Sequence, residues 1–153
     1  MKRTCAILIV SCDKYADLWD PFFTCFWNNW PDCPYVVYLQ SNTKKYKGQY
    51  RDRVQNVLTG KDENWSTSLK RTLVQIQEPY IFMWNEDLFF RSAVDSQLFA
   101  RYVTFLQTYK AKHIHYRNLP QSDRIYTPQR MLGVYDKGAP YRSIVMGFWD
   151  KQY

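Results

Sequence analysis

The continuous apolar run from Cys5 to Ser11 constrains the fold of this chain more than any other feature. It is rich in aliphatic residues, and no polar residue alternates with them, which is typical of a strand buried on both faces. Strands of this kind belong to parallel sheets that are covered by helices. A second run, Ile81 to Asp87, begins in the same way but ends in two adjacent carboxylates, Glu86 and Asp87.

Helical and strand patterns alternate along the rest of the chain. Asp20 followed by Pro21 predicts a capped helix start, and aromatic residues then recur at helical spacing as far as Trp30. Further expected elements are strands at 35–40, 54–58 and 113–116, helices at 66–77 and 95–109, and a late hairpin of 131–135 with 141–146. We therefore predict an α/β protein, a three-layer α/β/α sandwich with a mostly parallel, Rossmann-like sheet and an antiparallel hairpin at its edge.

Length and composition favour one domain over residues 1–153. With 153 residues and 46% hydrophobic content, the chain can bury one core but hardly two. The first apolar run is too short for a signal sequence, and the four cysteines lack the paired spacing of a zinc or thioredoxin site. We expect buried structural thiols and a reducing, cytoplasmic location.

The chain carries a surplus of positive charge. Its 21 Lys and Arg against 14 Asp and Glu give a net charge of +7, concentrated in the polar stretches Lys44 to Arg53 and Arg117 to Arg130. Such a surplus favours an anionic ligand or peripheral contact with an acidic membrane surface. Nucleic acid is a weaker alternative, because no helix-turn-helix, zinc-finger or RNA-recognition signature is present.

The acids at the end of the Ile81 to Asp87 run are the best functional indication. In open α/β sheets the carboxyl ends of the strands face the crevice that binds ligands. Carboxylates placed there can hold a divalent cation such as Mg²⁺. Phosphate oxygens and water then complete the coordination shell of the cation. The implied substrate is a phosphate ester or pyrophosphate. The alternative is that Glu86 and Asp87 only terminate the strand or cap a turn.

Several ordered motifs resemble those of one enzyme family. The matching stretches are Ile7 to Tyr15, Asp17 to Trp19 with Pro21 to Phe23, Trp30 to Pro34 with Tyr38-Leu39 and Ser41-Asn42, Gly60 with Trp65-Ser66 and Leu69, Glu86 to Phe89 with Val94-Asp95, and Pro140 to Ile144 before Trp149. In this order they resemble the nucleotide-sugar-dependent glycosyltransferases of the GT-A fold, in particular those of bacterial lipopolysaccharide and capsule genes and of large viruses.

The resemblance implies a donor site at the carboxyl end of the sheet. In the family a strand ends in an Asp-x-Asp element whose last acid binds the metal that bridges the donor diphosphate. Asn85-Glu86-Asp87 falls at that place, so Asp87 is the expected ligand of Mn²⁺ or Mg²⁺, and Asn85 departs from the pattern. Because of that departure, basic residues instead of a metal remain an alternative way to stabilise the leaving group; the candidates are Lys70, Arg91 and Arg117.

Other positions are implied to hold the nucleotide sugar. The loop from Ser11 to Tyr15 matches the place where the family holds base and ribose: Asp13 would accept a hydrogen bond and Tyr15 would stack. Trp65 is a further donor contact, and Glu86 belongs to the same site. For each of these residues, a purely structural role, such as a turn cap or a packed ring, is the alternative.

Transfer to an acceptor hydroxyl on a glycan, lipid-linked glycan or glycoprotein also calls for a carboxylate base if the reaction inverts the sugar. Asp150 is our first candidate and Asp95 the second. Family members usually continue well beyond the segment that ends here at Trp149, so we expect either a short transferase or a donor-binding remnant without turnover.

Overall fold

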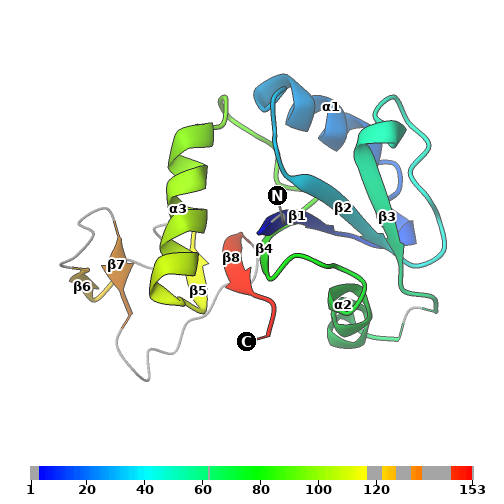
Figure 1. The fold of residues 1–153 in the computed structure, drawn as a ribbon. Coiled ribbons are helices and arrows are strands. Elements are labelled where there is room, and N and C mark those ends of the chain that lie inside the picture. The colour runs from blue at the N-terminus through cyan, green and yellow to red at the C-terminus, as the bar shows by residue number, and fades with distance from the viewer. Residues whose placement is uncertain (1–3, 62, 117–121, 127–131, 136–145, 153) are drawn as a thin grey trace.

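A six-stranded sheet forms the centre of the molecule (Figure 1), in a computed structural model that describes residues 4–61, 63–116, 122–126, 132–135 and 146–152. The strand order is β3-β2-β1-β4-β8-β5. The strands are β1 (Cys5–Val10), β2 (Val36–Ser41), β3 (Val54–Leu58), β4 (Tyr80–Asn85), β5 (His113–His115) and β8 (Gly147–Asp150). β1 to β4 are mutually parallel, whereas β8 runs antiparallel to both of its neighbours. The prediction of an α/β protein with a mostly parallel sheet is confirmed.

β1 is the central strand, as its apolar run predicts. All six of its residues are buried, and it pairs with β2 on one side and β4 on the other. The register places Val10 opposite Asn85, so β1 and β4 end at the same edge of the sheet. Because parallel strands share their direction, the polar residues that follow them meet at this edge.

Helices cover the sheet according to the alternation of side chains along β1. Ile7 and Ile9 belong to a cluster that includes the aromatic residues of α1 (Trp19–Asn29) and α3 (Ser96–Tyr109). Ala6 and Leu8 point the other way and pack in a second cluster, against which the leucines of α2 (Trp65–Leu73) lie. Figure 1 shows α2 on the side of the sheet away from α1.

The helix termini correct one sequence prediction and confirm another. α1 begins at Trp19 with Leu18 at its N-cap, so Asp20 is not the cap; its carboxylate instead accepts hydrogen bonds from the Tyr46 hydroxyl (2.6 Å) and the Gln49 N–H (3.3 Å). Asp95 does cap α3, where it accepts from the Leu98 N–H at 2.9 Å. α2 is capped by Asn64 and ends at Leu73, before the residue 77 that the pattern favoured.

The antiparallel elements differ from the predicted edge hairpin. β6 (Arg124–Ile125) pairs with β7 (Gly133–Val134) in a separate two-stranded sheet. β8 enters the main sheet between β4 and β5, so the antiparallel strand lies inside the sheet and not at its edge. The expected partner strand at 141–146 falls mostly outside the described residues.

Short helical turns and free thiols complete the description. The 3-10 turn η1 (Asp13–Tyr15) follows β1, and the 3-10 turn η2 (Arg51–Arg53) precedes β3. All four cysteines are free thiols, and burial raises the pKa of Cys33 to about 12, consistent with a structural role. Within the described residues, no helix combines the length and the apolar character that crossing a bilayer requires.

Phe82 tests how much of the stability comes from the aromatic cluster between β4, β8 and α3. It is 1% exposed, and its ring lies 4.7 Å from that of Phe148 and 5.2 Å from that of Phe99. We expect Phe82→Ala to lower the free energy of unfolding by about 3–5 kcal/mol, because it leaves a cavity in a packed core. Urea denaturation measures the change.

Val74→Ala is the control for that measurement, because Val74 is 82% exposed at the end of α2. Its effect should stay within about 0.5 kcal/mol. Equal losses in the two variants would contradict the assignment of the core.

Candidate functional site

An open cleft of about 550 Å³ lies at the edge of the sheet where β1, β2 and β4 end. We call it the acidic cleft, because Glu63, Glu86 and Asp87 line it while none of its described lining residues is Lys or Arg. Its size is within the usual range for small-molecule sites. The position is the one that open α/β sheets use to bind ligands.

A buried hydrogen-bond chain holds one wall of the acidic cleft. The Ser11 hydroxyl donates to Glu86 Oε1 at 2.9 Å and accepts from the indole N–H of Trp19 at 2.8 Å. Gln40 donates from Nε2 to the Ser11 carbonyl at 3.4 Å and accepts from the Thr72 hydroxyl at 2.8 Å. The ends of β1, β2 and β4 are thereby joined to α1 and α2.

The two adjacent acids lie in different environments. Glu86 is 6% exposed, and burial raises its pKa above the ordinary 4.5; the charge of Asp87 adds to the increase, and hydrogen bonds from its own N–H and from Ser11 oppose it. Asp87 is exposed and lines the cleft beside the half-buried Asn85. Asp87 is therefore the carboxylate that a ligand can reach.

Two exposed aromatic rings line the acidic cleft. Tyr15, in η1, and Trp65, the first residue of α2, are each 44% exposed. They come from different elements, and neither is packed beneath the surface. Exposed rings at a polar cleft are suited to stacking on a base or a sugar ring.

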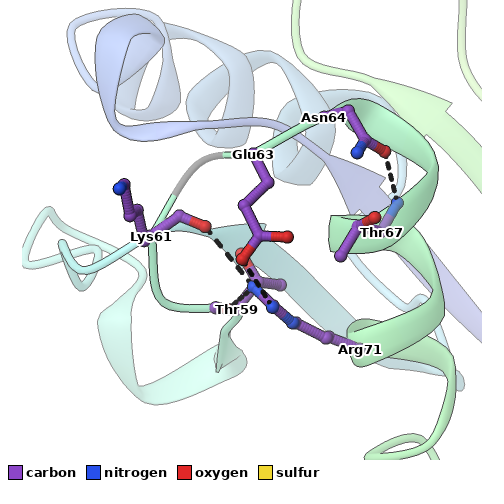
Figure 2. Close-up of polar contacts among 6 residues, drawn as sticks. All are labelled: Thr59, Lys61, Glu63, Asn64, Thr67 and Arg71. Atoms are coloured by element: carbon purple, nitrogen blue, oxygen red, sulfur yellow. Dashed lines mark hydrogen bonds and ion pairs between the residues drawn. The ribbon is translucent and has the colours of Figure 1, made fainter.

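Arg71 fixes the segment that carries Trp65 into the cleft. Figure 2 shows its guanidinium reaching back from α2 to the preceding loop, where Nη1 donates to the Thr59 carbonyl at 3.2 Å and Nη2 pairs with Glu63 at 2.9 Å. The Asn64 side chain then accepts from the Thr67 N–H at 2.9 Å and starts the helix. Trp65 thus projects from a helix start that is held on both sides.

Asp13 does not line the acidic cleft; it holds the loop after β2. Its carboxylate accepts from the backbone N–H groups of Asn42, Thr43 and Lys44 at 3.0 Å each and from the Thr43 hydroxyl at 2.6 Å. Partial burial opposes ionisation, but these hydrogen bonds outweigh it and keep the pKa of Asp13 below 3.8. The geometry favours the structural alternative for Asp13.

The two candidate bases lie away from the acidic cleft. Asp150 pairs in register with Tyr80, at the start of β4, whereas the cleft is beyond its end. Its carboxylate accepts from Lys112 Nζ at 2.5 Å, which lowers the pKa of Asp150. Asp95 is occupied as the cap of α3. The structure therefore argues against either acid as a base for chemistry in this cleft.

Sequence reasoning missed other lining residues. Gln40 and Asn42 come from the end of β2, and Asn64 and Ser68 from the start of α2. The rule that selected Glu86 and Asp87, polar residues at the carboxyl end of a strand, would also have selected Gln40 and Asn42. Ser68 carries no such signal, because it lies within the helical pattern.

The donor set of the cleft fits a hard cation shared with a ligand. Among the described residues, no group of three or more His, Cys, Asp and Glu forms a metal site by itself. Mg²⁺, however, is usually held by one or two carboxylates together with phosphate oxygens. The exposed Asp87 carboxylate beside the Asn85 amide meets that requirement. The basic candidates Lys70 and Arg91 do not line the cleft, and Arg117 lies outside the described residues.

Comparison of the chain with protein-family models and with curated proteins finds no match. The interpretation of the site therefore rests on its own residues.

Glu86→Gln tests whether folding raises the pKa of the buried Glu86 carboxyl group. Because unfolded Glu ionises near 4.5 while folded Glu86 keeps its proton to higher pH, wild-type stability should fall as pH rises from 4.5 through the folded pKa. Gln cannot ionise and can still accept the hydrogen bond from Ser11. We expect the stability of the variant, relative to wild type, to rise over this pH range in urea titrations between about pH 4 and 8.

The control, Glu63→Gln, removes an exposed carboxylate from the same cleft. A stability difference between Glu86→Gln and wild type that does not change with pH would show that folding leaves the pKa of Glu86 unchanged.

Proposed function

We propose that this protein is a glycosyltransferase of the GT-A type that binds a nucleotide sugar in the acidic cleft. The proposal includes the finer architecture, a three-layer α/β/α sandwich of the Rossmann-like kind. The observation that carries it is the exposed Asp87 at the end of β4, which shares one cleft with the exposed rings of Tyr15 and Trp65. A nucleotide sugar offers what this set can bind, namely a base, a sugar and a diphosphate.

The charge of the cleft favours a metal-dependent donor site. Asp87 would repel a diphosphate, and none of the described lining residues is a lysine or an arginine. Glu63 adds less to this repulsion, because Arg71 Nη2 pairs with it at 2.9 Å, and burial raises the pKa of Glu86. Mn²⁺ or Mg²⁺ held by Asp87, with Asn85 beside it, would supply electrostatic stabilisation of the departing diphosphate. Unit charges at about 4 Å interact by about 4 kcal/mol at an effective dielectric near 20, so this compensation decides binding.

The residues of the chain divide the remaining tasks. Tyr15 and Trp65 stack on the base or the sugar, and Gln40 and Asn42 border the same space with amide groups. Glu86, buried against Ser11, holds the ends of β1 and β4 together and thereby fixes the direction of Asp87. The acceptor is a hydroxyl on a glycan, a lipid-linked glycan or a glycoprotein, in the cytoplasm or at an acidic membrane surface.

Binding without turnover is the second candidate. It is favoured by a specific observation, since neither Asp95 nor Asp150 lies at the acidic cleft. Calorimetry with a nucleotide sugar, followed by an assay for released nucleotide, separates the two. Binding together with release supports the transferase, and binding alone supports the module.

Asp87→Asn should abolish the metal-dependent part of donor binding. A thermal-shift screen of UDP, GDP, dTDP and CMP sugars, with and without Mn²⁺, first identifies the donor. For that donor we expect the variant to lose at least about tenfold in affinity with Mn²⁺, which corresponds to about 1.4 kcal/mol. Without Mn²⁺ its affinity should equal or exceed that of wild type, because Asn no longer repels the diphosphate.

Asp52→Asn is the matched control, because Asp52 is an exposed acid outside the cleft. Undiminished Mn²⁺-dependent binding by Asp87→Asn would exclude Asp87 as the metal ligand.

Tyr15→Ala and Trp65→Ala should each weaken nucleotide-sugar binding whether or not metal is present. Stacking of an aromatic side chain on a base contributes about 1–3 kcal/mol, so we expect losses of roughly fivefold to a hundredfold in calorimetry. Tyr109→Ala is the control, because Tyr109 is 54% exposed and lies outside the acidic cleft. If Tyr15→Ala and Trp65→Ala bind as tightly as the control Tyr109→Ala, neither ring contacts the nucleotide sugar.

A further inference from the structure

A second cleft, of about 560 Å³, lies beside the first and has the opposite charge. We call it the lysine cleft, because Lys44, Lys45 and Lys47 line it. Asp20 is the single carboxylate among its lining residues, and it already accepts hydrogen bonds from the Tyr46 hydroxyl and the Gln49 N–H. The three lysines therefore give the cleft a surplus of positive charge, and the Lys44 ammonium also donates to the Asp13 carbonyl at 3.2 Å.

The loop that carries these lysines is built into the fold. The Lys44 N–H donates to Asp13 at 3.0 Å, and the Lys44 carbonyl accepts from the Ser41 hydroxyl at 2.6 Å. The Tyr46 N–H donates to Asn56 at 2.7 Å, and the Tyr46 side chain is only 5% exposed. These contacts fix the backbone on both sides of Lys45, which lowers the cost of ordering this loop when a ligand binds.

The cleft combines these cations with an apolar wall. The half-buried Ala16 and the edge of Trp19, which is 3% exposed, line it, and the Trp19 indole N–H donates to Ser11. Lys45 and Lys47 take part in none of the ion pairs found among the described residues. A ligand with an anionic head and an organic body matches both halves of this surface.

We propose that the lysine cleft binds a phosphate monoester, with the phosphate against the lysines and the organic part against Ala16 and the exposed edge of Trp19. Phosphate suits the site better than a single carboxylate, because it carries a charge of about −1.5 to −2 near neutral pH and has three acceptor oxygens. Binding here does not require nucleotide-sugar binding in the acidic cleft. The two clefts are neighbours, because Asn42 lines the acidic cleft and the next residue, Thr43, lines the lysine cleft.

The first measurement is calorimetry of the full chain with phenyl phosphate and with inorganic phosphate, at about 150 mM salt, where distant exposed charges are largely screened. We expect saturable binding, tighter for phenyl phosphate because of the apolar wall. Lys45→Gln combined with Lys47→Gln should reduce the affinity at least tenfold. The control double variant, Arg101→Gln with Lys110→Asn, removes two positive charges from α3 and its C-cap and should bind as wild type does; Asn suits Lys110, whose φ is 49°.

Gly48→Ala tests whether phosphate binding depends on the geometry of the lysine cleft or only on its positive charge. A Cβ at Gly48 would lie 2.0 Å from Asp20 Oδ1 and 2.5 Å from Tyr46 Oη, so either the loop or these two side chains must shift, although the charge of the cleft is unchanged. We expect weaker phenyl phosphate binding by this variant, with circular dichroism confirming that it folds.

The same variants are then tested on phosphatidylcholine vesicles with and without phosphatidic acid, which carries a phosphate monoester on a lipid. Binding of phenyl phosphate or of phosphatidic acid vesicles that is lost in the Lys45/Lys47 variant but kept in the control supports the proposal and identifies a soluble or a lipid source. Three outcomes overturn it: no binding of either probe, equal loss in both double variants, or binding of RNA alone through Lys45 and Lys47.

Discussion

The hydroxyl of Ser11 is the contact on which both clefts depend. It joins the end of β1 to the acid that follows β4, and it accepts the indole N–H of Trp19 from α1. Each partner is buried, so the loss of this hydroxyl would leave an acid and an indole N–H without their hydrogen bond inside the protein. The same bridge fixes Glu86 on the side of the acidic cleft and Trp19 on the side of the lysine cleft.

Asp13 separates the two clefts in a similar way. It follows β1 directly, and its carboxylate binds three successive N–H groups of the loop that leaves β2. A carboxylate used in this way is not available to a ligand. It does, however, set the boundary between a cleft lined by carboxylates and one lined by ammonium groups. The net charge of +7 thus gives no indication of the local charge at the acidic cleft.

The sequence predicted the sheet well, because the evidence for it is local. The apolar run of β1 and the acid-tipped run of β4 each specify a buried strand, and parallel pairing then places their ends together. The same reasoning placed Glu86 and Asp87 at one cleft, and Ser11 and Asn85, to which the resemblance pointed, line it as well. Tyr15 and Trp65 also lie there, although only the resemblance pointed to them.

Long-range pairing explains what the sequence did not predict. Asp150 follows an apolar pair near the end of the chain, and its distance from the cleft depends on whether β8 runs parallel or antiparallel to β4. The antiparallel pairing with Tyr80 carries Asp150 to the opposite end of the sheet. Asp20 likewise looks like a helix cap in sequence, but the buried Tyr46 hydroxyl, 26 residues away, takes its carboxylate.

The opposite charges of the two clefts limit what each can bind. The exposed Asp87 carboxylate of the first cleft would repel a phosphate group that has no cation, whereas it would attract the cation of a metal complex. A bare phosphate monoester is attracted to the second cleft without any metal. Ser11, Asp13 and Asp20 are all held by hydrogen bonds and fix this separation of charge. If both proposals hold, we expect a metal-bound diphosphate and a free phosphate ester to bind at different positions on the chain.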